Sequence, residues 1–301
     1  MFNRTITTLN FEGNTIRILT GKDDQVLSWE SLTFPEEQMS QGLIHKPDAV
    51  SERLKQWLDE HGGGHRVFTS VTDQRSVHRM LTLPAIDEQL LDETIQRKAK
   101  QEFAIPIEDV DLSWQIADRA HNQYQIYVLA VPKQIIDRQM ETIQLTNLKV
   151  QAVRSKSLAL IAAANQSQAL IINLEPYSMA VIIVVDGIPV IVRTVSLESG
   201  DLPREAKLDL LHQELTRTTK FYNESNKQNR LSEDTPLFPT GSLFEPLPVE
   251  ERLMDRPSLT DRLRGRTTYP VRGYKPALAI PPKMPLMQYA VNIGLFPTDN
   301  P

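Results

Sequence analysis

The chain has 301 residues, which is enough to bury one large hydrophobic core or two smaller ones. It contains no cysteine, which excludes disulfides and thiolate chemistry, and its formal net charge of -5 argues against a general nucleic-acid binder. The first residues lack the regions of a signal peptide, and no run approaches the roughly 18 apolar residues of a membrane span. These features predict a cytoplasmic protein with no transmembrane segment of its own.

The chain opens with an expected strand meander. Residues 5–9, 15–19 and 25–32 are the expected strands, and they are separated by turns at 10–14 and 20–24. A helix is expected next over residues 47–60, with Pro47 in its first turn, an apolar stripe along one face, and three glycines at 62–64 that end it.

Residues 66–146 follow as an expected α+β insert, with the order strand, strand, helix, strand, strand, helix. We expect the first two strands, over residues 66–71 and 77–83, to pair with each other. The insert therefore separates a first subdomain over residues 1–65 from a second half over residues 147–301.

A second and clearer meander lies at residues 169–194. Asp186-Gly187 is a strong two-residue hairpin signal, and the flanking runs are rich in isoleucine and valine throughout. Continuous apolar strands are typical of a sheet that is covered on both faces. Two related meanders predict two similar halves.

The rest of the second half is short. A helix is expected over residues 202–222, almost directly after the meander, and a short helix over 285–295 is expected to return to the core. Prolines gather after residue 235, and six arginines lie from Arg252 to Arg272, which indicates an extended or mobile loop. This basic loop either is simply solvated or meets anionic lipid or an acidic partner.

Several short motifs occur in order between residues 81 and 163. They include Leu83-Pro84 at a strand end, an acidic helix, Ile105-Pro106, an aspartate-containing strand and the stretch from Ala130 to Lys133. Together they resemble the PilM family, the actin-like cytoplasmic proteins of type IV pilus assembly, and weaker likeness extends over residues 5–295. The resemblance implies an α/β, actin-like (ribonuclease-H-like) fold of two related halves, with the insert subdomain of PilM and FtsA proteins and a shortened second half.

The resemblance also implies where a nucleotide would bind. Actin-like ATPases hold phosphates and magnesium on two loops of the form Asp-x-Gly, because glycine admits the phosphate and aspartate holds the metal through water. The corresponding positions here are Asn10, Glu12, Gly13, Asn14 and Thr15 in the first loop, Asn173 and Glu175 in the second, and Thr240 and Gly241 in the turn expected near adenosine.

Both loops thus read Asn-x-Glu. Asparagine is a poorer partner for hydrated magnesium, and one like charge near a phosphate costs about 4 kcal/mol at roughly 4 Å with an effective dielectric of about 20. We therefore expect neither ATP nor magnesium as a cofactor. The alternative is that nucleotide binds with altered geometry on the turn made by Gly13, Asn14 and Thr15.

No catalytic or metal-ligating pattern emerges from the sequence, because the six histidines lack ligand spacing and the acidic pairs fit solvated helix faces. We expect a non-enzymatic scaffold. The resemblance implies that it binds the cytoplasmic tail of a PilN-like inner-membrane protein, in a groove between the first subdomain and the insert, alongside other pilus assembly proteins. Through this partner it would lie at the inner face of the membrane. The alternatives are an ATP-gated switch or ATPase, a type II secretion assembly module, or an FtsA-like filament protein. Self-association into a homo-oligomer is a further possible interaction.

Overall fold

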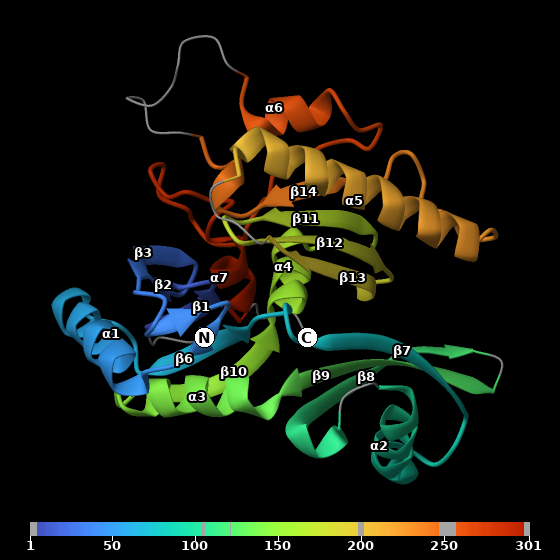
Figure 1. Cartoon of the computed structure of the whole chain (residues 1–301), viewed down its shortest axis with the longest axis horizontal. Helices are drawn as coiled ribbons and strands as arrows, with labels where there is room; N and C mark the ends of the chain where they lie inside the picture. Colours follow the sequence, from blue (N-terminus) through green and yellow to red (C-terminus); the bar gives the residue numbers. More distant parts are fainter. Residues whose placement is uncertain (1–4, 104–105, 121, 198–201, 247–256, 298–301) are drawn as a thin grey trace.

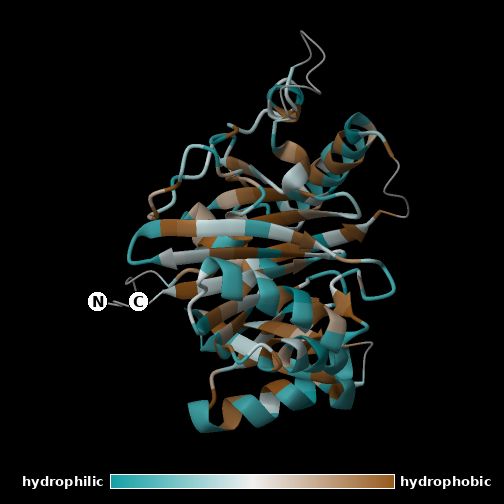
Figure 2. Cartoon of the chain, turned by 90° about the vertical axis from the view of Figure 1, so that its left-hand side faces the viewer, coloured by the Kyte–Doolittle hydropathy of each residue, from teal (hydrophilic) through white to brown (hydrophobic). Residues whose placement is uncertain are grey.

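The computed structural model describes residues 5–103, 106–120, 122–197, 202–246 and 257–297. Two halves, each built on one sheet, are stacked with helices between them, and a smaller body lies beside the first half (Figure 1). Apolar residues predominate on the strands, whereas the outer helices carry many hydrophilic residues (Figure 2). Among the described residues, no helix has both the length and the apolar character needed to cross a bilayer.

The first half contains a five-stranded sheet in the order β10-β6-β1-β2-β3. Its strands are β1 (Ile6–Glu12), β2 (Thr15–Lys22), β3 (Gln25–Thr33), β6 (Arg66–Val71) and β10 (Lys149–Ser155). β1, β2 and β3 form the expected antiparallel meander, whereas β6 runs parallel to both β1 and β10. The helices α1 (Pro47–His61) and α3 (Lys133–Gln144) pack on its outer face through one apolar cluster. A short hairpin, β4 (Met39–Ser40) and β5 (Leu43–Ile44), precedes α1.

The second half repeats this arrangement with a four-stranded sheet in the order β13-β12-β11-β14. Its strands are β11 (Ala169–Leu174), β12 (Ser178–Val185), β13 (Ile188–Ser196) and β14 (Leu237–Thr240). β14 runs parallel to β11, as β6 does to β1, so the two sheets share one topology. The helix α5 (Arg204–Ser225) covers the outer face together with α6 (Leu259–Arg264).

Two helices, α4 (Lys156–Ala164) and α7 (Ala290–Leu295), fill the space between the sheets. They cross very closely at Gly294, where a Cβ atom would stand 1.7 Å from the carbonyl oxygen of Ala159. The molecule is therefore layered as helices, sheet, helices, sheet, helices. This order covers both sheets on both faces, as the near-continuous apolar strands predict.

The insert is smaller than residues 66–146. It comprises the sheet β7-β9-β8, from β7 (Val77–Pro84), β8 (Val110–Ala120) and β9 (Gln123–Pro132), with α2 (Leu91–Glu102) and the short 3-10 helices η1 (Glu88–Leu90) and η2 (Ile107–Asp109). The expected pairing of the strands at 66–71 and 77–83 is wrong, because β6 lies inside the first sheet. Almost all of β6 is buried, which suits a central strand, whereas β7 has exposed positions along its length. β10 likewise belongs to the first half, not to the second.

The proline-rich C-terminal part is ordered where the structure describes it. Leu237 donates its backbone N–H to Pro270 and accepts one from Arg272, each at 2.9 Å, which fixes this stretch beside β14. The short helix α6 lies within residues 252–272, the range in which an extended or mobile loop is expected. Residues 247–256, with Arg252 and Arg256, lie outside the described residues, as do Ile105 and residues 198–201.

Candidate functional site

The two expected nucleotide loops occupy equivalent places in the two halves. Glu12 ends β1 in the first half, and Glu175 follows β11 in the second half. Two residues before each glutamate an asparagine bonds to the neighbouring parallel strand. Asn10 accepts from Ser70 Oγ at 2.9 Å, and Asn173 Nδ2 donates to Thr240 Oγ1 at 3.0 Å. The structure therefore brings the predicted positions together as a pseudo-symmetric pair.

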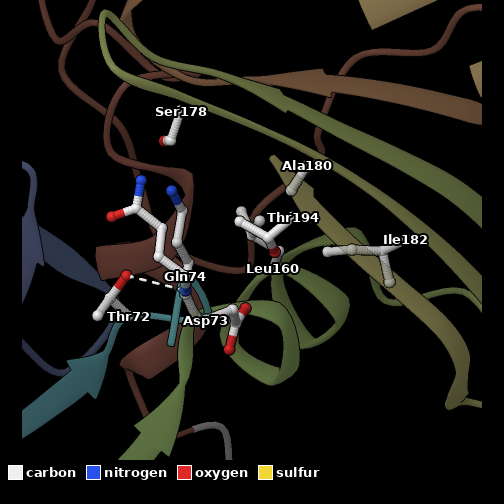
Figure 3. Close-up of a pocket in the computed structure, with 9 residues that line it drawn as sticks. Thr72, Asp73, Gln74, Leu160, Ser178, Ala180, Ile182 and Thr194 are labelled. Atoms are coloured by element: carbon white, nitrogen blue, oxygen red, sulfur yellow. Dashed lines mark hydrogen bonds between the residues drawn. The ribbon is translucent and has the colours of Figure 1, made fainter. Parts of the chain in front are cut away.

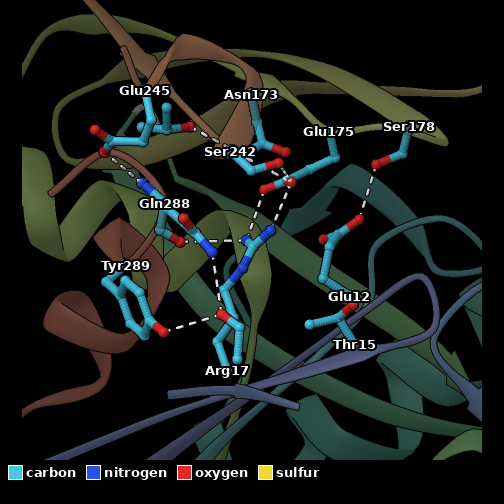
Figure 4. A network of polar contacts seen from close by, with 12 residues as sticks. Glu12, Thr15, Arg17, Asn173, Glu175, Ser178, Ser242, Glu245, Gln288 and Tyr289 are labelled. Carbon is cyan, nitrogen blue, oxygen red and sulfur yellow. Dashed lines mark hydrogen bonds and ion pairs between the residues drawn. The ribbon is translucent and has the colours of Figure 1, made fainter. Parts of the chain in front are cut away.

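Glu175 forms a bidentate ion pair with Arg17, which lies on β2 of the opposite half (Figure 4). Both nitrogen–oxygen distances are 2.7 Å, and the two side chains are 5% and 1% exposed. Ser242 donates its hydroxyl to the same carboxylate at 2.6 Å, and Arg17 also donates to the carbonyl of Gln288 at 3.2 Å. This geometry joins the second loop to the first sheet through a desolvated, charge-assisted contact.

Glu12 has its own pair of partners. It forms a buried ion pair with Lys156, the first residue of α4, and accepts a hydrogen bond from Ser178 Oγ at 2.9 Å. Ser178 begins β12 of the second half, so this carboxylate also connects the two halves. Each loop glutamate is thus held by a buried cation and a serine hydroxyl, and the Arg17–Glu175 and Ser178–Glu12 contacts are the ones that join the two halves.

These contacts correct one part of the sequence-based argument. The glutamates do not present uncompensated negative charge, because each is neutralised by a buried cation. Sequence reasoning found Glu12 and Glu175 but missed Arg17 and Lys156. A signal was available: Arg17 lies between the isoleucines of β2, Lys156 begins an apolar helix, and a buried charge requires a partner.

The other residues of the first loop are engaged away from this network. Asn14 Nδ2 donates to the carbonyl of Phe34 at 2.9 Å, and the hydroxyl of Thr15 lies 3.2 Å from that of Thr33. Gly13 accepts from the backbone of Gly42 at 2.7 Å. These bonds tie the turn to the chain that follows β2.

Gly241 lies beside the second loop. Its φ of +100° lies outside the range favoured by residues with side chains, and a Cβ atom there would stand 2.3 Å from the carbonyl oxygen of Leu174. Glycine at this position lets the turn after Thr240 pack against the loop and bring Ser242 to Glu175. The turn expected near adenosine therefore supports an internal contact.

Little space remains beside Glu12. A cavity of about 10 Å³ is lined by residues that include Asp73, Lys156, Ser178 and Thr194 (Figure 3). That volume has room for about one water molecule, whereas ligand pockets measure about 300–1,000 Å³. A phosphate chain would have to displace both carboxylates from their cations. The residues at these loops therefore do not fit a magnesium nucleotide in this arrangement, and within the described ranges no three metal-ligating side chains gather.

The Arg17 contact predicts a pH dependence of stability. Burial by itself raises the pKa of Glu175, but the Arg17 guanidinium and the hydrogen bonds outweigh burial and lower this pKa to about 2. Because the native pKa lies below that of the unfolded chain, the ion pair contributes stability above about pH 4.5 and loses it toward pH 2. Urea unfolding of native protein and Glu175→Gln across this window should give a shallower pH slope for the variant. Equal slopes would contradict the lowered pKa.

Two sheets of matching topology, helices packed between them, and two hairpin loops that face each other define an actin-like fold. No protein-family model matches the sequence, and neither does any curated protein sequence. Among solved structures, the chain is similar to the one described as the PilM–PilN type IV pilus biogenesis complex. The TM-score is 0.76 at 18% identity, and the match covers 97% of each chain.

Two further structures share the fold at lower similarity. The cytoplasmic domain of EpsL, an inner-membrane component of the type II secretion system of Vibrio cholerae, matches with a TM-score of 0.52 at 13% identity, over 87% of this chain and 95% of that one. The ethanolamine utilization protein EutJ from Carboxydothermus hydrogenoformans matches with a TM-score of 0.53 at 7% identity, over 97% and 90%. The actin-like fold inferred from the sequence is therefore confirmed.

Proposed function

We propose that this chain is a PilM-like scaffold of a type IV pilus assembly complex, which acts by binding a partner and not by turning over ATP. The observation that carries the proposal is the agreement with the PilM–PilN complex along 97% of both chains. The likeness to EpsL is weaker and covers less of this chain, which favours pilus assembly over type II secretion.

Loss of nucleotide binding is the first part of the proposal, and the ion pairs support it. Arg17 and Lys156 are the cations placed at the two loops, and both are bound to carboxylates of the chain itself. Opening one such buried pair leaves an uncompensated charge, which costs about 3–5 kcal/mol. A nucleotide would have to overcome two such costs. In this proposal the Arg17–Glu175 pair and the Ser178–Glu12 hydrogen bond hold the halves together in place of phosphates and magnesium.

Partner binding is the second part. We infer that the partner is the cytoplasmic tail of a PilN-like membrane protein, bound as an extended peptide in a groove between the first half and the insert. Extended peptides gain backbone hydrogen bonds and a few side-chain pockets in such grooves. Apolar packing holds the insert against the first half. Tyr127, Leu129 and Val131 of β9 share an apolar cluster with Val71 and Ile135 of the first half. A rigid groove lowers the entropy lost on binding.

The test uses synthetic peptides that span the cytoplasmic N-terminal tails of the single-span pilus assembly proteins from the same organism. Fluorescence anisotropy is measured with each peptide and its scrambled version, with and without magnesium ATP. We expect one tail to bind at about micromolar affinity, its scrambled version to fail, and ATP to change the affinity less than about twofold. Binding by no tail would overturn the partner assignment. Binding that requires ATP would overturn the nucleotide-free scaffold.

A further inference from the structure

A second groove lies between the insert and the second half. Its volume is about 690 Å³, and it is lined by β7, β13 and the C-terminal part of α5. Its lining includes Arg79 of β7, Val190 and Val192 of β13, and Arg217 and Phe221 of α5. This groove is separate from the ion pairs between the loops and from the groove assigned above to the membrane protein's tail.

Both strands that border the groove are sheet edges. β7 is an outer strand of the insert sheet, and β13 is an outer strand of the second sheet. Within the described part of the chain, neither free edge receives a backbone hydrogen bond from another segment. Natural proteins normally protect such edges with charges, bulges or covering segments. Here Val190, Ile191 and Val192 lie half-buried along the edge of β13 and line the groove.

The charged side chains of the groove that make no ion pair with a described residue are positive. Arg193 is balanced by Glu214, with 2.7 Å between Nε and Oε1. Arg79 and Arg217 are exposed, and neither makes an ion pair with any residue that the structure describes. Phe221, which lines the same groove, leaves 63% of its surface exposed, which is unusual for a large aromatic side chain. The groove thus combines apolar surface with two free cations.

We propose that this groove binds an extended acidic segment of a partner protein, which adds a strand to the edge of β13. Alternate side chains of a strand point to opposite faces. A segment that alternates acidic with apolar residues can therefore direct one set at Arg79 and Arg217 and the other at Phe221. Backbone pairing supplies affinity, and the two arginines select the sign of the charge.

The probe is a short fluorescent peptide that alternates glutamate with valine, and its control replaces glutamate with lysine. The test variant is R79E/R217E. The matched control is R97E/R230E, which makes the same change of net charge at exposed arginines outside the groove. We expect the native protein to bind the acidic peptide at least about tenfold more tightly than the lysine peptide. R79E/R217E should lose this preference, and R97E/R230E should keep it.

Hydrogen exchange locates the bound peptide. The acidic peptide should slow exchange at the backbone amides of β13. Equal affinity for the two peptides, an unchanged preference in R79E/R217E, or protection that excludes β13 would each overturn the proposal. Analytical sedimentation without peptide tests whether a second copy of the chain occupies the groove. Self-association of the native chain that R79E/R217E abolishes would assign the groove to a second copy and would also overturn the proposal. Because these readouts use neither the membrane tail nor ATP, they are independent of the proposed function.

Discussion

Replacing Arg17 with methionine is expected to lower the free energy of unfolding by about 3–5 kcal/mol. The substitution leaves the carboxylate of Glu175 buried, with Ser242 as its remaining side-chain partner at hydrogen-bond distance. Equilibrium unfolding in urea measures the change. The same loss is expected from Glu175→Leu, which leaves the guanidinium of Arg17 without its carboxylate.

The double variant R17M/E175L separates the ion pair from a general loss of packing. With both charges removed, most of the stability should return, so the two single effects should be strongly non-additive. An exposed pair provides the control: Arg119 and Glu88 also lie 2.7 Å apart but are 55% and 60% exposed. Glu88→Gln should therefore cost no more than about 1 kcal/mol. Additive effects of the two Arg17 and Glu175 substitutions would contradict direct coupling across the loops.

Gly294→Ala is the second substitution with a large expected effect. Its Cβ would stand 1.7 Å from the carbonyl oxygen of Ala159 and 3.1 Å from the backbone nitrogen of Ala163. Backbone atoms cannot move aside as a flexible side chain can, so α7 and α4 would have to separate. We expect a loss of about 3 kcal/mol, at the upper end of typical overpacking costs. Thermal unfolding and urea titration both measure it.

Gly265→Ala is the matched control for this substitution. Gly265 has an ordinary helical φ of -75°, and a Cβ atom would lie no closer than 3.6 Å to its neighbours. This change should alter stability by less than about 1 kcal/mol. If Gly294→Ala were tolerated equally well, the close contact between Gly294 and Ala159 would not constrain the packing of α4 and α7.

Local patterns predicted the elements that are set by neighbouring residues. Asp186 and Gly187 both have positive φ, at 54° and 76°, as the hairpin signal requires. The helix α1 likewise begins at its proline and ends at Gly62. In both cases the residues that determine the structure are adjacent in the chain.

Contacts between residues far apart in the chain could not be predicted from the sequence. Closeness in the chain predicts that β6 pairs with β7, whereas β6 pairs with β1 and β10. Arg17 and Glu175 are 158 residues apart, so no local window contains both. The sequence places Glu12 and Glu175 in the two loops, but the partner of Glu175, Arg17, is set by how two distant halves pack. The composition of β2 and α4 indicated only that Arg17 and Lys156 needed partners.

The most direct test of the central claim is a calorimetric titration of the native chain with magnesium ATP. We expect no binding heat at millimolar nucleotide, because Arg17 and Lys156 are held by Glu175 and Glu12. A variant with aspartate at positions 10 and 173 and glycine at positions 12 and 175 is titrated alongside, since it frees both cations and restores the Asp-x-Gly pattern. Micromolar binding of ATP by the native chain would contradict the account and would identify a nucleotide-gated protein.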